Sequence, residues 1–208
     1  MDLELTSRTR RSRAETKENT HRLLLEAAQS LFMRAGYQGA TLDRIAASAG
    51  FTKGAVYAHF DNKEALFLEL LGAQLRENVM HLDALIALGN EQPECLDDEL
   101  GRWIDGVDER DNLPLMVLEL EFESRRNPSF LAVLEQVILR HQRALAGIIT
   151  RYFEITGRAA PMPVEELAAS IIVLAEGVAL SRLTRPSGKL TSAKAIRVLL
   201  GMPAASAK

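Results

Sequence analysis

Side chains suited to contact with a polyanion are concentrated between residues 52 and 59. The run TKGAVYAH sets small residues beside one long cation and two polar aromatic rings: Thr52, Lys53, Gly54, Ala55, Tyr57 and His59. Small side chains let a backbone approach base edges, Lys53 can reach a guanine or a phosphate, and Tyr57 can donate to a phosphate. These residue types point to double-stranded DNA as the partner of this segment.

Two short helices joined by a tight turn are needed to present these side chains together. Within residues 41–60, Thr41 is expected to cap the first helix and Thr52 to cap a second that ends near Phe60. Ala46 leaves room for a steep crossing, and an apolar seam joins the pair: Leu42, Ile45, Ala49, Val56 and Phe60. The pattern is typical of a helix-turn-helix, whose second helix can enter the major groove. A plain helical corner gives a similar seam and is the alternative.

Positive charge is concentrated in the same part of the chain. Residues 7–63 carry ten Lys or Arg against five Asp or Glu, although the net charge of the whole chain is -3. The arm at 1–15 holds Arg10, Arg11 and Arg13, which are suited to an adjacent minor groove. A basic head on an acidic body predicts a polyanion partner for the head alone. A solvated terminus without a partner is the alternative for the arm.

Helix-forming residues dominate the chain, so we expect an all-α fold of about nine helices. Apolar periodicity places the later helices near 96–110, 113–125, 128–155, 164–183 and 192–200. The run VLELEFE alternates like a strand, but no partner strand is visible and a helix is expected there. The expected domains are an arm at 1–15, a DNA-binding domain at 16–63 with its helix-turn-helix at 41–60, and a helical domain at 64–208.

Turn and capping residues mark the ends of the first helices. The first helix, from about Thr16, is expected to end before Gly36, and Gly50 is expected to terminate the second. Asp61 followed by Glu64 has the spacing of a capping box and is expected to open a long fourth helix.

Residues 19–71 resemble the N-terminal domain of the TetR family of bacterial transcriptional regulators (tetracycline-repressor-like). The matching pieces are LLLEAAQSLFMRAGYQGATLDRIAASAG and FTKGAVYAHFDNKEALFLELL, in which an aromatic-x-x-Phe pattern precedes a Lys-Glu pair: Tyr57-Ala58-His59-Phe60 and Lys63-Glu64. The resemblance implies a three-helix DNA-binding head joined to a larger helical domain that dimerises and senses a small molecule.

The resemblance also implies roles for single residues. Thr41 and Lys63, each at the start of a helix, would hold phosphates together with helix N-terminal amides. Tyr57 and His59 would contact the DNA backbone, and residues 52–55 would face bases. For Tyr57 and His59, a place in the core that supports the helix pair is the alternative.

Dimerisation has a physical basis in the helix expected at 164–183, which is apolar over more than half of its circumference. Together with the last helix it can form half of a two-fold four-helix bundle, with a candidate interface of Leu167, Ile171, Leu174, Ala175, Val178, Ile196, Leu199 and Leu200. Completion of the core of a single subunit is the alternative for this stripe.

The sequence indicates a ligand cavity less clearly than it indicates the DNA-binding segment. Bulky residues that can line one, with an acid among them, are Trp103, Met116, Glu119, Phe122 and Phe130. Core packing is the alternative for the bulky ones. Glu119, Glu121 and Glu123 lie close together, and one turned inward would favour a cationic ligand, although a solvated face is the alternative.

Several classes of function lack their motifs. No Gly-rich phosphate loop, nucleophile elbow or zinc set is present, so we expect neither an enzyme nor a metal or cofactor site. The longest apolar run has nine residues, and a single Cys fits a reducing compartment, so a cytoplasmic protein without a membrane span is expected. These features predict a homodimeric repressor that binds a palindromic operator and is released by a small-molecule effector. A DNA-binding activator or architectural protein without a ligand is the alternative, and an enzyme is the least favoured class.

Overall fold

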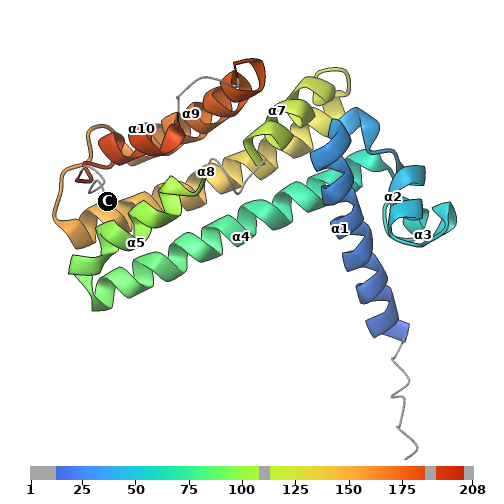
Figure 1. Cartoon of the computed structure of the whole chain (residues 1–208), viewed down its shortest axis with the longest axis horizontal. Coiled ribbons are helices and arrows are strands. Elements are labelled where there is room, and N and C mark those ends of the chain that lie inside the picture. Colours follow the sequence, from blue (N-terminus) through green and yellow to red (C-terminus); the bar gives the residue numbers. More distant parts are fainter. Residues whose placement is uncertain (1–12, 108–112, 186–190, 204–208) are drawn as a thin grey trace, which may run out of the picture. The chain divides into compact units, whose positions relative to one another are not determined.

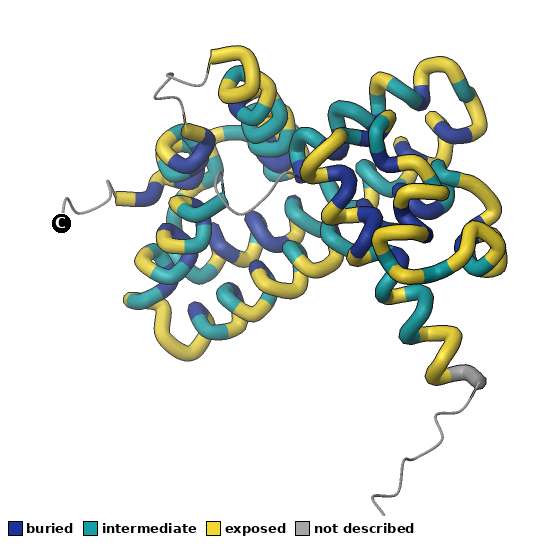
Figure 2. The backbone as a smooth tube through the Cα atoms, turned by 45° about the vertical axis from the view of Figure 1, so that its right-hand side comes forward, coloured by how far each residue is buried: buried dark blue, intermediate teal, exposed yellow. Residues whose placement is uncertain are grey.

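The computed structural model describes residues 13–107, 113–185 and 191–203. Within these ranges the fold is all-α, with nine helices and no strand, which confirms the predicted class (Figure 1). The chain divides into two compact units, Met1–Phe67 and Leu68–Lys208. In each unit the buried residues follow the inner sides of the helices, and exposed residues cover the outer sides (Figure 2).

The first unit contains three helices and the start of a fourth: α1 Arg13–Gly39, α2 Leu42–Ser48, α3 Lys53–Tyr57 and α4 Lys63–Glu91. Its core is formed by Leu24, Leu31, Phe32, Ile45, Ala46, Val56, Phe60 and Phe67. The ring of Phe67 packs at 5.9 Å from that of Phe32 and edge-on at 5.0 Å from that of Tyr37, measured between centroids. This apolar centre holds α2 and α3 in their crossed arrangement.

Side-chain caps define the helix-turn-helix. The hydroxyl of Thr41 accepts from the amide of Arg44, and the hydroxyl of Thr52 accepts from the amide of Ala55, as the sequence predicts. Gly50, with φ of 75°, makes the turn between α2 and α3. This φ lies in the left-handed region that favours glycine.

Three helix boundaries of the first unit differ from the prediction. Helix α1 departs from helical geometry at Gly36, as expected, but one more turn follows and reaches Gly39. Helix α3 ends at Tyr57 rather than near Phe60, because the amide of His59 bonds to the carbonyl of Val56, three residues back, which interrupts the run of four-residue bonds. Asp61 does not cap α4: the side chain of Asn62 accepts from the amide of Ala65 at 2.7 Å. A capping box needs its acid at the third helical position, and Glu64 stands at the second.

In the described part of the second unit, the rest of α4 is followed by five further helices: α5 Pro93–Asp105, α7 Leu113–Ser124, α8 Pro128–Thr156, α9 Val164–Thr184 and α10 Ser192–Leu199. Helix α9 packs against α7, α8 and α10, and α10 also packs against α5. Four of these helices lie within one residue of their predicted ranges, and the run VLELEFE is helical as expected. Helix α5 begins three residues before the predicted range 96–110 and ends at Asp105, and residues 108–110 lie outside the described residues.

Polar links fasten α5 to the helices around it. The hydroxyl of Tyr152 donates to Asp97 at 2.8 Å, and the guanidinium of Arg158 holds the same carboxylate and lowers its pKa. Arg197 of α10 forms a two-pronged pair with Asp105, at 2.9 Å and 2.7 Å. A Cβ atom at Gly101 would overlap the guanidinium of Arg197, so this glycine makes room for the side chain that reaches Asp105.

Helix α9 has an unusual surface. Within the described ranges it is the one helix that is long and apolar enough to cross a membrane, with a mean hydropathy of 1.6 over its most apolar 18 residues. The longest apolar run, residues 167–175, already contains Ser170 and ends at Glu176, whereas the mean hydropathy over 18 residues stays high across both polar residues. Core helices pass the same test, so it is weak support for a span. Only 17% of the window is buried, however, which leaves apolar side chains of α9 exposed.

Candidate DNA-binding surface and ligand cavity

Helix α3 presents its predicted contact residues outward. Val56 is fully buried and anchors the helix, whereas Thr52, Lys53 and Gly54 are exposed and the side chain of Tyr57 is 50% exposed. Ala55 is half-buried between the two groups. The short helix is therefore held from one side by the core, and its polar side faces solvent.

Lys53, the cationic residue of α3, forms an ion pair within the first unit. The ammonium of Lys53 lies 2.9 Å and 3.0 Å from the two carboxylate oxygens of Asp43 at the start of α2. The hydrogen bond and the negative charge of Asp43 raise the pKa of Lys53. Both side chains are more than half exposed, so the pair is screened by water and a phosphate can compete for the ammonium. Sequence reasoning missed this pair, because Asp43 lies in the first turn of α2, at the end away from the turn to α3, and only the crossing of the two helices brings Lys53 to it.

His59 belongs partly to the surface and partly to the packing. It is half-buried, and its ring lies 5.4 Å from that of His21 and 6.3 Å from that of Phe60, measured between centroids. His21 stacks on Phe60 at 4.7 Å. Sequence reasoning missed His21, whose position three residues before Leu24 on the apolar stripe of α1 was an available signal.

The remaining predicted DNA contacts differ in their surroundings. Thr41 is exposed at the N-terminus of α2. Lys63 is half-buried at the start of α4, and its ammonium lies 3.8 Å from the centre of the Tyr37 ring, a cation–π contact. Arg10 and Arg11 lie outside the described residues; Arg13 begins α1, but its side chain also lies outside the described part.

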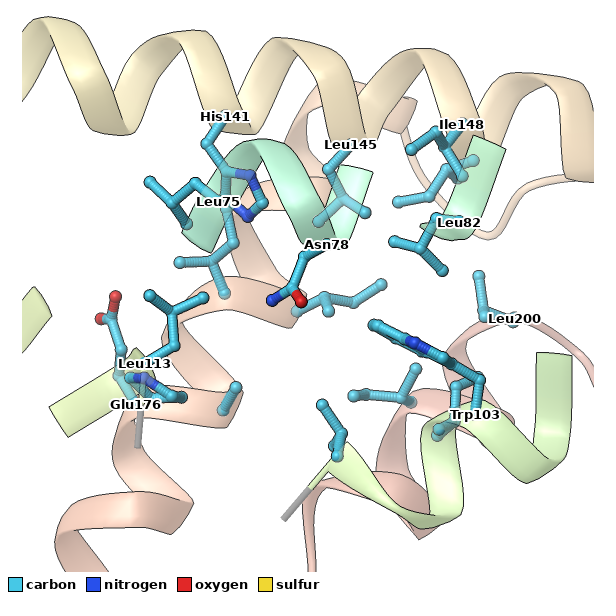
Figure 3. Close-up of a pocket in the computed structure, with 18 of the residues that line it drawn as sticks. Leu75, Asn78, Leu82, Trp103, Leu113, His141, Leu145, Ile148, Glu176 and Leu200 are labelled. Carbon is cyan, nitrogen blue, oxygen red and sulfur yellow. The ribbon is translucent and has the colours of Figure 1, made fainter. Parts of the chain in front are cut away.

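The second unit encloses an apolar cavity of about 150 Å³, lined by residues of α4, α5, α7, α8, α9 and α10 (Figure 3). Most of the lining side chains are aliphatic. The polar ones are Asn78 of α4, Trp103 of α5, His141 and Tyr152 of α8, and Glu176 of α9. A largely apolar pocket with a few polar groups is the usual form of a small-molecule site.

Burial shifts the pKa values of three titratable residues that line this cavity, Glu176, His141 and Tyr152. Burial and the nearby negative charge of Glu121 on α7 raise the pKa of Glu176 to about 7. Burial also raises the pKa of Glu121 and lowers that of His141. The Nδ1 atom of His141 is buried and has no hydrogen-bond partner among the described residues. The cavity therefore contains a carboxyl group whose ionised form is destabilised, that of Glu176, and a neutral imidazole, that of His141.

The predicted set of cavity residues is corrected in four places. Trp103 lines the cavity as expected. Met116 and Phe130 point into the core, the alternative weighed for them, and Phe122 is 64% exposed. Glu119 is not among the lining residues. The residues that sequence reasoning missed are Asn78, His141 and Glu176; of these, Glu176 carried a signal as a lone acid within an apolar helix.

The predicted interface residues of α9 and α10 fall into two groups. Four are buried within the subunit, namely Leu167, Val178, Ile196 and Leu200, and completion of the subunit core describes these four. The other four are half-buried, with Ile171 and Ala175 facing the cavity and Leu174 and Leu199 packed against the core, and their place in an interface stays a prediction. The exposed apolar side chains of these two helices are Val173, Leu180, Leu183 and Val198.

Known proteins resemble part of this chain in sequence. A model described as "Bacterial regulatory proteins, tetR family" matches residues 24–70. The HTH-type transcriptional regulator TtgW of Pseudomonas putida is 44% identical over 85 residues, which are 40% of this chain and 60% of TtgW. The match spans less than two thirds of TtgW and smaller shares of the next curated relatives.

Solved structures match the chain over most of its length. The regulator FadR of Bacillus subtilis, in complex with stearoyl-CoA, has a TM-score of 0.64 at 18% identity, over 87% of this chain and 96% of FadR. A transcriptional regulator of Saccharomonospora viridis, in complex with choline, has a TM-score of 0.59 at 23% identity, over 88% of this chain and 94% of that one. Identities this low establish the fold alone. The family match therefore assigns residues 24–70, which include the helix-turn-helix, to the TetR family of bacterial regulatory proteins, and the solved structures show that the chain has the same fold.

Proposed function

We propose that this chain is a homodimeric repressor that binds a palindromic operator through two copies of α3 and is released by a small molecule in the cavity of the second unit. The observation that carries the proposal is the outward face of α3 within a TetR-family domain. The proposed repressor acts in the cytoplasm, where its operator DNA is found.

In the proposed complex, α3 enters the major groove and residues 52–55 face the bases. Gly54 supports this arrangement, because the fold does not require a glycine there: a Cβ atom would meet nothing closer than the Thr52 hydroxyl, at 3.9 Å. A residue without a side chain at this exposed position lets the backbone approach base edges. Tyr57, Thr41 and Lys63 then hold phosphates on either side.

The proposed dimer uses the exposed apolar side chains of α9 and α10. Val173, Gly177 and Leu180 lie at i, i+4 and i+7, on one face of α9. Val173 and Leu180 are 65% and 47% exposed, and a Cβ atom at Gly177 would meet open space. Apolar side chains around a glycine suit close packing against the same helix of a second copy. A dimer is needed because a palindrome presents its half-sites about 34–36 Å apart.

The proposed effector acts through α4. This helix contributes Leu75, Asn78 and Leu82 to the cavity and begins at Lys63, a proposed phosphate contact. A ligand that prefers one placement of α4 therefore biases the placement of Lys63 and of the helices before it. A coupling free energy of about 3 kcal/mol would weaken operator binding roughly 150-fold. The relatives with stearoyl-CoA and choline support a small-molecule role for this fold, but these ligands differ so much that neither indicates the effector here.

Footprinting tests the proposal. The purified chain is incubated with DNA that flanks its own gene, and fluorescence anisotropy measures the affinity for the protected segment and for a scrambled duplex. We expect a protected palindrome and an affinity at least about a thousandfold above the scrambled duplex. Equal affinity for both duplexes would contradict a sequence-specific regulator.

A further inference from the structure

We propose that the cavity takes a cationic apolar ligand, an alkyl or aryl ammonium whose charge is held by Glu176. The inference rests on the proposed function, because it assigns a chemical class to the effector.

The walls exclude a strongly polar ligand. Of the 22 described residues that line the cavity, 17 have purely hydrocarbon side chains. The hydroxyl of Tyr152 already donates to Asp97 outside the cavity, so it offers no free donor. A sugar or a nucleotide would leave many of its own polar groups without partners on such walls. The body of the ligand is therefore apolar.

The charge of the cavity has one sign. Glu176 is the sole formally charged residue among the described lining residues, and no Lys or Arg accompanies it there. Besides burial, the charge that raises the pKa of Glu176 is another carboxylate, that of Glu121 on α7. An anionic ligand would meet two like charges, whereas a cation would be attracted by both. The raised pKa of Glu176 shows that these charges oppose ionisation of the empty site, an opposition that a bound cation removes.

His141 does not act as the missing counter-ion. Burial lowers its pKa, so the imidazole is neutral near pH 7. In Figure 3, Glu176 and Trp103 lie on opposite sides of the cavity, with Asn78 between them. A ligand with its ammonium at Glu176 would therefore extend its apolar body toward the ring of Trp103.

Trp103 makes the test direct, because it is the single tryptophan of the chain and it lines the cavity. Its fluorescence is titrated in the full-length protein with three probes that share an eight-carbon chain: octyltrimethylammonium, octan-1-ol and octanoate. We expect the cation to bind about tenfold more tightly than the alcohol, and octanoate to bind most weakly. Equal affinity for octanoate and the cation would overturn the assignment of charge.

Two matched variants locate the charge. Glu176→Gln should remove the preference for the cation while octan-1-ol still binds, and retained alcohol binding shows that the cavity has kept its fold. Glu135→Gln is the control, because it makes the same change at an exposed position of α8 away from the cavity. If Glu176→Gln keeps the preference, or if no probe changes the fluorescence of the original chain, the inference is wrong.

An operator-release assay distinguishes failure of this inference from failure of the proposed function. Release of a labelled operator is followed by anisotropy in parallel with the Trp103 titration. If the three probes bind with equal affinity and all release DNA, the effector proposal holds and the cationic class is wrong. If the cation binds through Glu176 and no operator is released, the charge assignment holds and the effector role is wrong.

Discussion

The two units of this chain use polar groups in opposite ways. In the first unit the polar side chains that matter are exposed on α2 and α3, and an apolar centre serves only to hold them there. In the second unit the walls are apolar and a few polar groups are enclosed, at a cost visible in the shifted pKa values of Glu176 and His141. An exposed charge is screened and suits a large, highly charged partner. A buried charge is strong over a short distance and suits one small partner.

Disruption of the proposed dimer should have the largest effect, because it removes the second copy of the first unit from the complex. Val173→Glu places a charge on the exposed apolar face of α9. We expect monomers by sedimentation and operator affinity reduced about a hundredfold, through loss of the linked second contact. Val133→Glu on α8 is the control, since Val133 is 50% exposed and is not in the proposed interface. A dimer that survives Val173→Glu would place the interface elsewhere.

A change at Gly54 separates DNA contact from stability within the first unit. Gly54→Ala should stabilise α3 by about 0.5–1 kcal/mol, because alanine is the better helix former. Operator affinity should nevertheless fall about tenfold, since the methyl group stands between the backbone and the base edges. Thermal unfolding and anisotropy measure the two effects. Gly147→Ala on α8, where a Cβ atom also meets open space, should leave DNA binding unchanged; equal operator affinity for both variants would refute base contact at Gly54.

The buried carboxylate of the second unit should make stability depend on pH. Because the pKa of Glu176 is raised to about 7 in the folded chain, the folded state binds more protons between about pH 4.5 and 7 than the unfolded state does. The contribution of this group to the free energy of unfolding therefore falls as pH rises through that range. Compared with Glu176→Gln, the original chain should lose on the order of 1–2 kcal/mol between pH 5 and 8, measured by urea unfolding. Parallel curves for the two proteins would contradict a buried, ionising Glu176.

The exposed pair in the first unit should give the smallest effect. Asp43→Asn frees the ammonium of Lys53, so affinity for scrambled duplex DNA should rise a few-fold and the salt dependence should steepen by about one counterion. Specific binding should change less, which lowers the specificity ratio. Asp61→Asn serves as the control, because it removes an exposed charge from the same unit without touching Lys53. Identical salt slopes for the two variants would show that Asp43 does not compete with phosphate.

Local sequence patterns predicted the helices well, because helix caps and helix ends depend on residues that are close together in the chain. The caps at Thr41 and Thr52 and the break at Gly36 were read from single residues and their spacing, and all three are confirmed. The family match also confirms the expectation of a transcriptional regulator rather than an enzyme. The cap at Asn62 was missed because neighbouring Asp and Asn residues compete for the same role, and the choice depends on where the helix begins.

The sequence by itself determined which segments are helical and which helix carries the side chains proposed to contact DNA. It could not determine what lies opposite each apolar residue of α9, because apolar side chains cover most of that helix and its partners come from distant parts of the chain. Packing decided that Leu167 and Val178 are buried while Val173 and Leu180 face outward. It also brought Asn78, His141 and Glu176 from three helices to one cavity. Periodicity records the faces of one helix, whereas burial depends on all the helices that surround it.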